Sequence, residues 1–255
     1  MRVLKIGGRT QGDPMFTRVI RDAWCAAPGE LCVIHGGGDE VSAMQRALGR
    51  EAAFVGGRRV TSQGDLDLLR MVLSGVVNKR LVSSLVAADV PAVGLSGEDG
   101  ALVSAEFIDR AVLGYAGRPV SINTDLLLSL MNGGYLPVIS PVGFNGESGV
   151  GGALNVNGDD AAAAIAVALT ASELVFVADV EGVLDTEDRV IGNLTLEQAR
   201  EMIANGTAAA GMAAKLESAE SALANGVASV RICALRGVSD SRGGTFLTQS
   251  QSVAI

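Results

Sequence analysis

Two glycine runs are the part of the sequence best suited to chemistry, because each one follows a short apolar stretch typical of a strand. LKIGG ends in Gly7 and Gly8, and VIHGGG ends in Gly36, Gly37 and Gly38. In an open parallel sheet, ligands bind beyond the carboxyl ends of the strands, where glycines let the backbone come close and following helices offer N-terminal amides. One such run alone could be a tight turn, but the pair favours a site for an anion.

Two lysines stand near glycines of this kind. Lys5 lies in the first apolar stretch, and Lys215 follows Gly211 in GMAAKLES, near the start of an amphipathic helix. A lysine close to a helix N-terminus opposes the helix dipole, so Lys215 is a candidate for function, and Lys5 is placed to contact a phosphate. The competing interpretations are a snorkelling edge residue for Lys5 and an exposed side chain for Lys215.

Polar residues are concentrated in the segment LNVNGDD. Asn155 and Asn157 precede Asp159 and Asp160, and these two acids open a helix that is apolar enough to be buried. We expect one of the acids to be the N-cap of that helix. The remaining polar groups exceed what capping requires and are candidates to bind or orient a ligand.

Two adjacent arginines, Arg58 and Arg59, occur in GGRRVTS, just before a long predicted helix. A guanidinium group can bind a carboxylate through two parallel hydrogen bonds, so this segment is a candidate for recognising an acidic substrate. The alternative interpretation is a solvated hairpin tip.

Glycine loops also occur in esterases, P-loop enzymes and dinucleotide-binding proteins, but the other motifs of those classes are missing from this sequence. HGGG also occurs as an oxyanion-hole loop in esterases, but that mechanism needs a GxSxG elbow and a later histidine. GLSGE at 94–98 breaks the elbow pattern, and His35 is the only histidine. The chain has no Gly-Lys dipeptide for a Walker A loop, and GVGGAL at 149–154 lacks the last glycine of a dinucleotide fingerprint.

Composition narrows the class of protein further. The net charge is −8 and the pI about 4.7, which argues against a nucleic-acid or anionic-membrane surface. The three cysteines, Cys25, Cys32 and Cys233, show no CxxC spacing, and no export signal or membrane-length apolar run is evident. We therefore expect a cytoplasmic protein without nucleic-acid or membrane partners.

Apolar runs alternate with helical patterns through most of the chain. This alternation predicts an α/β fold with an open, largely parallel sheet sandwiched by helices. A hairpin is expected at 51–59, short antiparallel strands at 101–123, and a glycine-rich seam at 144–152. The expected strands are 1–6, 31–35, 91–95, 137–142, 174–178 and 230–234, and the expected helices are 15–26, 40–48, 66–88, 124–132, 160–170, 196–205 and 213–225.

Taken together, these segments resemble the amino acid kinase family, and within it the enzymes that phosphorylate N-acetylglutamate. The resemblance implies that ATP phosphorylates the side-chain carboxylate of N-acetyl-L-glutamate, giving an acyl phosphate for arginine biosynthesis. It also implies two lobes sharing one sheet, with the amino-acid substrate and dimer contacts in 1–157 and the nucleotide in 158–255. The matching segments, in chain order, are LKIGG, VIHGGG, GGRRVTS, MVLSGVVNKRLV, GLSGEDG, NGGYLPVISP, LNVNGDDAA, FVADVEGVLD and GMAAKLESA.

The resemblance also assigns roles to individual residues. Lys5 and Lys215 would stabilise charge on the phosphoryl group in the transition state, and Asp159 would organise both lysines. Arg59 and Asn155 would bind the α-carboxylate of the substrate. Glycines of the two loops would lie against the substrate (Gly37, Gly38) or the phosphates (Gly7, Gly8, Gly36), and the nucleotide would contact Asp179, Gly182, Leu184, Gly211 and Met212, with adenine and ribose near 179–184 and 208–212.

Phosphoryl transfer of this kind requires no protein nucleophile, and the attacking carboxylate is already ionised near neutral pH. His35 is therefore expected to be a structural residue and not a base. Mg²⁺ would arrive with ATP and keep phosphate and water ligands, so no protein metal ligand is expected. Because the resemblance links arginine-inhibited hexamers to an N-terminal helix before the Lys5 strand, we expect an arginine-insensitive homodimer joined through helix 66–88.

Two alternatives remain open on the sequence. Arg58 is not required by the N-acetylglutamate pattern, and it raises the relative that phosphorylates α-aminoadipate or glutamate attached to an acidic amino-group carrier protein. The net charge of −8 favours such a partner less than a free small molecule. A noncatalytic amino-acid or nucleotide sensor is the other alternative, although binding alone would not need the charge arrangement of Lys5, Asp159 and Lys215.

Overall fold

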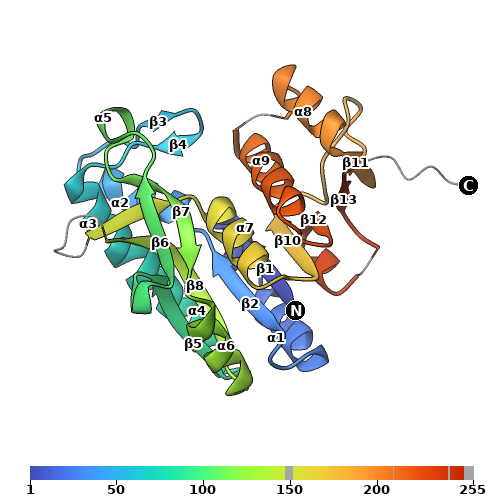
Figure 1. The fold of residues 1–255 in the computed structure, drawn as a ribbon, viewed down its shortest axis with the longest axis horizontal. Helices are drawn as coiled ribbons and strands as arrows, with labels where there is room; N and C mark the ends of the chain where they lie inside the picture. Colours follow the sequence, from blue (N-terminus) through green and yellow to red (C-terminus); the bar gives the residue numbers. More distant parts are fainter. Residues whose placement is uncertain (147–151, 209, 241, 250–255) are drawn as a thin grey trace, which may run out of the picture.

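The computed structural model describes residues 1–146, 152–208, 210–240 and 242–249. Its main feature is an 11-stranded sheet that runs through the whole molecule (Figure 1). The strand order is β11-β13-β12-β10-β1-β2-β8-β6-β7-β9, and β5 pairs with β8 beside this path. The pairs β12–β10, β10–β1, β1–β2, β2–β8 and β5–β8 are parallel, as predicted.

All six predicted strands are present. They are β1 (Arg2–Ile6), β2 (Leu31–His35), β5 (Ala92–Gly97), β8 (Leu136–Asn145), β10 (Glu173–Ala178) and β12 (Val230–Ala234). Two short strands that were not predicted, β11 (Asn193–Thr195) and β13 (Thr245–Thr248), extend the sheet at one edge.

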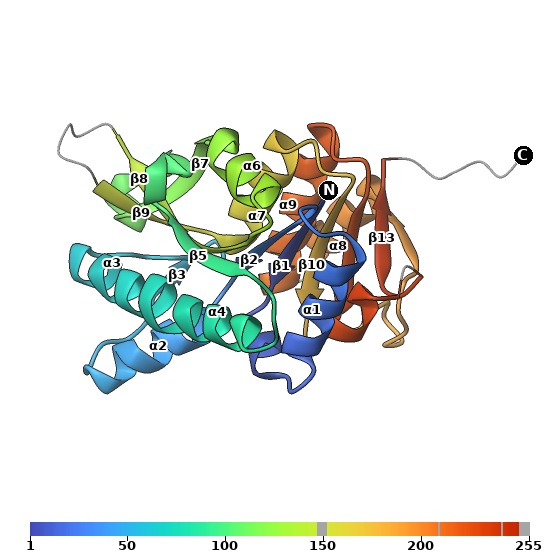
Figure 2. The same cartoon turned by 90° about the horizontal axis from the view of Figure 1, so that it is seen from below.

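Helices cover both faces of the sheet (Figure 2). Successive residues of a strand point to opposite faces, so β1 contributes Val3 to one apolar core and Leu4 and Ile6 to the other. The core that contains Val3 lies under α6 (Thr124–Asn132), α7 (Gly158–Ala168), α8 (Leu196–Ala204) and α9 (Ala210–Ala224). The opposite core lies under α1 (Phe16–Ala26), α2 (Gly38–Ala47), α3 (Gln63–Leu69), η2 (Arg70–Val77) and α4 (Asn78–Val86).

The long helix predicted at 66–88 is one continuous element made of three parts. It begins at Gln63, three residues earlier than predicted, because Ser62 and Asp65 form a reciprocal capping box. Its middle part, η2, is a π-helix that joins α3 to α4. The helix lies on the outside of the molecule (Figure 2).

The antiparallel regions also match the predictions. β6 (Val103–Phe107) and β7 (Ala116–Ile122) pair antiparallel, with the short helix α5 (Arg110–Leu113) between them. β3 (Phe54–Val55) and β4 (Arg58–Arg59) form the small hairpin, whose turn residues Gly56 and Gly57 have φ of 54° and 74°. These left-handed angles explain the glycine pair.

Two sequence predictions concern the part of the chain that leads into α7. The seam predicted at 144–152 starts inside β8 and ends at the first residue of β9 (Gly152–Val156), which pairs antiparallel with β8, while 147–151 lie outside the described residues, and its place between two lobes stays a prediction. The helix expected to begin with an acidic N-cap is instead capped by Asn157, whose side chain accepts a hydrogen bond from the amide of Asp159 at 2.7 Å. Neither acid is therefore needed as the cap.

The described part of the chain also contains three short 3₁₀ segments, η1 (Arg9–Gly12), η3 (Asp99–Ala101) and η4 (Leu235–Val238). Within the described ranges, no helix is long and apolar enough to cross a membrane.

Candidate active site

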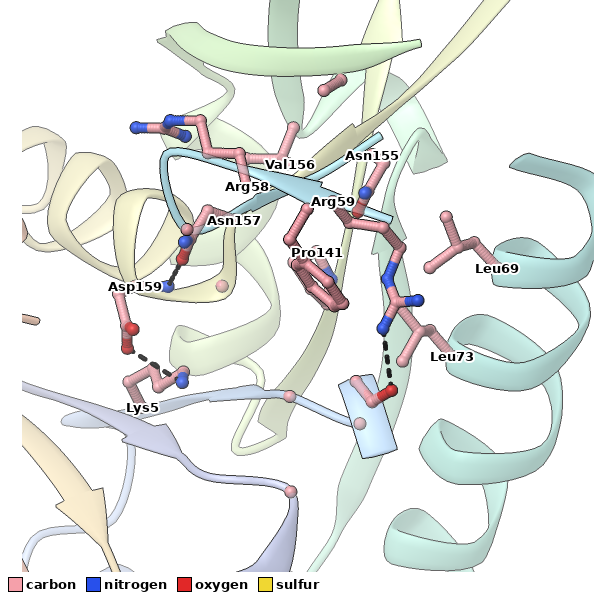
Figure 3. A pocket seen from close by; sticks show the side chains of 18 of the residues that line it. Lys5, Arg58, Arg59, Leu69, Leu73, Pro141, Asn155, Val156, Asn157 and Asp159 are labelled. Carbon is pink, nitrogen blue, oxygen red and sulfur yellow. Dashed lines mark hydrogen bonds and ion pairs between the residues drawn. The ribbon is translucent and has the colours of Figure 1, made fainter. Parts of the chain in front are cut away.

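A pocket of about 250 Å³ opens beyond the carboxyl ends of β1 and β2, where the two glycine loops meet the N-terminus of α7 (Figure 3). The hairpin β3–β4 and the long helix close it on the other sides. Its lining includes most of the predicted acceptor and phosphate residues: Lys5, Gly8, Gly36, Gly37, Gly38, Arg59, Asn155 and Asp159.

Lys5 and Lys215 converge on one carboxylate at this pocket. Lys5 Nζ lies 2.8 Å from Asp159 Oδ1, and Lys215 Nζ lies 3.5 Å from Asp159 Oδ2. Lys5 comes from β1 and Lys215 from the second turn of α9, so Asp159 joins two elements that are more than 200 residues apart. The side chains of Lys5 and Asp159 are nearly buried, at 9% and 6% exposure. The three residues that the sequence grouped are therefore adjacent in space.

The charges of Lys5 and Lys215 act on the pKa of Asp159, and that of Asp159 acts on Lys215. Burial acts to raise the pKa of Asp159, but the charges of Lys5 and Lys215 outweigh burial and hold that pKa below its usual range. Burial lowers the pKa of Lys215, which the charge of Asp159 partly restores and that of Lys5 lowers further. The Asp159 carboxylate is therefore ionised at neutral pH. Its negative charge offsets the repulsion between the ammonium groups of Lys5 and Lys215.

The two glycine loops touch each other beside Lys5. The amide of Gly7 donates to the Val177 carbonyl at 2.9 Å, and that of Gly36 donates to the Ile6 carbonyl at 2.8 Å. These two glycines thus continue the sheet pairing into the loops. A Cβ on Gly36 would lie 3.4 Å from the Gly8 amide nitrogen, so the loops pack at backbone contact distance.

Among the five glycines of the two loops, Gly37 has the clearest requirement for glycine. Its φ is 154°, and an added Cβ would lie 2.7 Å from Leu73 Cδ2 in the long helix. The next residue, Gly38, begins α2, so its amide belongs to the first turn of a helix directed at the pocket.

Arg59 is held rigidly at the pocket. Its Nη1 donates to Gln45 Oε1 at 2.5 Å, and its Nη2 donates to the Gly38 carbonyl at 2.9 Å and to Ser42 Oγ at 2.8 Å. Its guanidinium carbon lies 4.8 Å from the centre of the Phe54 ring. These contacts fix the direction of the guanidinium group before any ligand binds, which is the preorganisation that recognition of a carboxylate requires.

Asn155 faces the same pocket from β9. Its Nδ2 donates to Thr61 Oγ1 at 2.9 Å, and Thr61 Oγ1 donates to the Arg59 carbonyl at 3.1 Å. This chain sets the orientation of the Asn155 amide. The two residues expected to bind one carboxylate thus share a hydrogen-bonded support.

His35 is buried behind the second glycine loop and does not line the pocket. Its Nδ1 lies 2.8 Å from the Gly36 carbonyl and its Nε2 lies 3.1 Å from Asn78 Nδ2. Because a carbonyl can only accept, Nδ1 carries the proton and Nε2 accepts from Asn78. Burial lowers the pKa of His35 to about 4, so the ring is neutral and its contacts are those of a structural residue.

Three of the residues expected to bind the nucleotide, Asp179, Gly211 and Met212, lie near Lys215. Asp179 follows β10 and is close enough to Lys215 for its charge to act on the lysine pKa, while Gly211 and Met212 belong to the first turn of α9. Of the predicted loop 208–212, residue 209 is outside the described residues. Gly182 and Leu184 make structural contacts: a Cβ on Gly182 would lie 2.6 Å from Thr245 Oγ1, and Leu184 forms a β-bridge with Val190.

Some residues of the site were missed in the sequence. Arg9, which follows Gly8, pairs with Asp39 at 3.0 Å and Asp179 at 3.1 Å and links the second glycine loop to the predicted nucleotide side. Its position directly after a glycine pair was the available signal. Gln45 and Ser42, which support Arg59, gave no signal because nothing in their spacing shows that α2 passes the hairpin.

Over the described ranges, no group of three or more His, Cys, Asp or Glu side chains is arranged to hold a metal ion. The donors around the pocket are mainly ammonium, guanidinium and amide groups, which suit a ligand rich in negatively charged oxygens.

This fold and site define a member of the amino acid kinase family, to which the chain belongs. The family model matches residues 1–234. The chain is 41% identical over 251 residues to the acetylglutamate kinase of Chloroflexus aurantiacus. This alignment covers 98% of this chain and 97% of that protein. The chain is also 41% identical over 234 residues to the acetylglutamate kinase of Halalkalibacterium halodurans, covering 90% and 87% of the two chains.

Solved structures agree on the fold. The crystal structure of the smu.665 protein from Streptococcus mutans superposes with a TM-score of 0.87 at 30% identity and covers 98% of both chains. A carbamate kinase from Giardia superposes with a TM-score of 0.75 at 16% identity over 98% of both chains, which is a likeness of fold alone.

Proposed function

We propose that this protein transfers the γ-phosphoryl group of ATP to the side-chain carboxylate of N-acetyl-L-glutamate. The observation that carries the proposal is the convergence of Lys5, from β1, and Lys215, from α9, on Asp159 at a small pocket. The acetylglutamate kinases at about 41% identity over nearly the whole chain support the choice of acceptor.

The arrangement suits a reaction in which the protein stabilises charge and provides no covalent intermediate. A carboxylate oxygen of the acceptor attacks the γ-phosphorus and ADP leaves, so an acyl phosphate forms and no proton needs to be removed. Lys5 and Lys215 would share the negative charge of the phosphoryl group in flight. Asp159 would hold both lysines in place during transfer.

The local charge is suited to anionic substrates although the chain as a whole carries −8. Four cations lie around the N-terminus of α7, and three of them share ion pairs with two carboxylates. The cations are Lys5, Arg58, Arg59 and Lys215, and the carboxylates are Asp159, which pairs with both lysines, and Asp160, which pairs with Arg58. ATP and an amino-acid acceptor would bring further negative charge to these cations.

Acceptor binding is assigned to the hairpin side of the pocket. Arg59 and Asn155 would hold the α-carboxylate, with Gly37 and Gly38 against the substrate. A cavity of about 250 Å³ lies below the usual range of drug-sized ligand sites, which favours a small amino-acid derivative. Leu69 and Leu73 offer the apolar wall that an acyl group would need.

Nucleotide binding is assigned to 158–255, with the acceptor and dimer contacts in 1–157. Gly7, Gly8 and Gly36 would lie against the phosphates, and Asp179, Gly182, Leu184, Gly211 and Met212 would contact the rest of ATP. Mg²⁺ would be held by phosphate oxygens and water, in keeping with its preference for retaining hydration. The enzyme would act in the cytoplasm.

A homodimer through the long helix is part of the proposal. Met71, Val76 and Val86 are 60%, 55% and 52% exposed on this helix, and a contact with a second copy would cover them. Val76→Glu is expected to convert dimers into monomers in sedimentation velocity, because it places a charge in the contact. Val112→Glu, at an equally exposed valine on α5, is the control, and dimers that survive Val76→Glu would contradict the assignment.

The function is tested by incubating purified protein with Mg-ATP, hydroxylamine and N-acetyl-L-glutamate. We expect hydroxamate to form in step with ADP. No hydroxamate at millimolar acceptor, together with turnover of carrier-linked aminoadipate or glutamate, would replace the free amino acid as substrate. Failure with both acceptors would favour a sensor. Arg58, which raised the carrier alternative, forms an ion pair with Asp160.

A further inference from the structure

Arg58 and Asp160 form an ion pair beside the cluster of Lys5, Asp159 and Lys215. Arg58 Nη1 lies 2.7 Å from Asp160 Oδ2, and Ser218 Oγ donates to Asp160 Oδ1 at 2.8 Å. The hairpin β3–β4 is thereby joined to α7 and, through the same carboxylate, to α9. None of these three residues has a role in the phosphoryl transfer described above.

The Asp160–Ser218 hydrogen bond joins the same two helices as the Asp159–Lys215 ion pair, α7 and α9. Asp159 and Asp160 are successive residues at the start of α7, so their side chains diverge by about 100° around the helix axis. Lys215 and Ser218 lie three residues apart and therefore share one face of α9. One acid receives the lysine and the other receives the serine.

The two neighbouring arginines of the hairpin also have different partners. Arg58 and Arg59 are successive residues of β4, and their side chains point to opposite sides of that strand (Figure 3). Arg59 points into the pocket toward Gly38, whereas Arg58 points toward α7. A contact that holds Arg58 therefore also fixes the strand from which Arg59 projects.

Arg58 lies between two neighbouring cavities and lines both. It lines the pocket of about 250 Å³ and a neighbouring groove of about 590 Å³ between β7, α7 and α9. The hairpin has only two residues in each strand, and it pairs with no other strand in the described structure. Such a hairpin is marginal by itself, so its position over the pocket depends on contacts at its ends.

We propose that Arg58 is a positioning residue for the acceptor: its ion pair with Asp160 fastens the hairpin to α7 and thereby holds Arg59 in the pocket. This inference rests on the proposed function for the identity of the acceptor. The pair is partly shielded from water, with side-chain exposures of 31% and 21%, so it is stronger than a typical surface pair.

The test compares Arg58→Gln, Asp160→Asn and the double variant in steady-state kinetics. Each single variant is expected to raise the KM for N-acetylglutamate roughly 3- to 10-fold, leave the KM for ATP within about twofold, and lower kcat little. The double variant is expected to be no worse than either single one, because both remove the same contact. Arg118→Gln, which changes another arginine of the same groove, is the control.

Amide hydrogen exchange of residues 54–59 without substrates gives a readout that does not depend on activity. We expect faster exchange there in Arg58→Gln and Asp160→Asn than in the wild type and Arg118→Gln. An unchanged acceptor KM together with unchanged exchange would overturn the role of Arg58. An inactive wild type would instead overturn the proposed acceptor, and the exchange result would still decide whether the ion pair positions the hairpin.

Discussion

Lys215 Nζ lies 3.5 Å from Asp159 Oδ2, although the two residues stand on different helices and 56 positions apart in the chain. Lys5 occupies the other oxygen of the same carboxylate. One buried acid therefore sets the spacing of the two ammonium groups that are expected to act on the phosphoryl group.

Removing Lys215 should affect the reaction more than binding. Lys215→Ala deletes an ammonium group whose strongest interaction is expected with the phosphoryl group in the transition state. We expect kcat to fall about 10²- to 10³-fold, with acceptor and nucleotide affinities changed by much smaller factors. Steady-state kinetics combined with calorimetric binding of a non-hydrolysable ATP analogue measures both effects. A large loss of affinity with kcat nearly unchanged would refute the assignment.

Neutralising Asp159 should move the alkaline limb of the pH–rate profile. The charge of Asp159 raises the pKa of Lys215 against the lowering effects of burial and Lys5. Asp159→Asn removes that support, so Lys215 loses its proton at a lower pH than in the wild type. The kcat profile between pH 7 and 10 is the measurement. A limb at the same or a higher pH would show that Lys215 is not the titrating group.

Arg59→Lys should weaken binding of the acceptor without slowing the chemical step. A lysine keeps the charge but cannot reproduce a planar guanidinium group held at once by Gln45, Gly38 and Ser42. We expect the KM for the acceptor to rise about 10- to 100-fold and kcat to change by less than about fivefold. If the KM for ATP rose instead, the arginine would belong to the nucleotide side.

His35 should make the protein sensitive to acid through stability. Its pKa is about 4 in the folded protein and near 6.5 when unfolded, so the unfolded chain binds a proton first as pH falls. The stability associated with neutral His35 is complete above about pH 6.5 and is lost as pH falls toward 4. The loss is about 3 kcal/mol at pH 4.

Denaturant unfolding of wild type and His35→Asn at pH 7 and pH 4 tests this. The wild type should lose about 3 kcal/mol more than the variant between the two pH values, and the variant should keep turnover at pH 7.5 within about fivefold. A much lower kcat with unchanged stability would indicate a chemical role for His35.

The sequence was informative where a residue's task is local. Strands end where glycines follow apolar runs, and Gly56 and Gly57 marked a turn that needs positive φ, so the sheet and hairpin were predictable. Lys5 and Lys215 could be flagged because each stands near the end of a predicted element, and the family resemblance grouped them with Asp159. The partners of Asp160 were not predictable, because they depend on the packing of α7 against the hairpin and α9.

Tertiary contacts account for what was missed. The π-helical middle of the long helix has no local signature of its own, and the cap of α7 turned out to be Asn157. Arg58 could be flagged as unusual, but its partner Asp160 lies 102 residues away and only the fold brings them together. Arg9 was overlooked because its partners come from separate elements: Asp39 lies in α2, and Asp179 directly follows β10.

Isotope transfer distinguishes phosphorylation of the side-chain carboxylate from hydrolysis of ATP, because it follows the oxygen that attacks the phosphorus. N-acetylglutamate labelled with ¹⁸O in that carboxylate is incubated with enzyme, Mg-ATP and hydroxylamine, and the released inorganic phosphate is analysed by mass spectrometry. Attack by the carboxylate makes its oxygen the bridge of the acyl phosphate, and hydroxylamine then expels phosphate by attacking the acyl carbon. We predict one ¹⁸O in each phosphate released. Phosphate without the label would show hydrolysis of ATP by water and would contradict the proposed reaction.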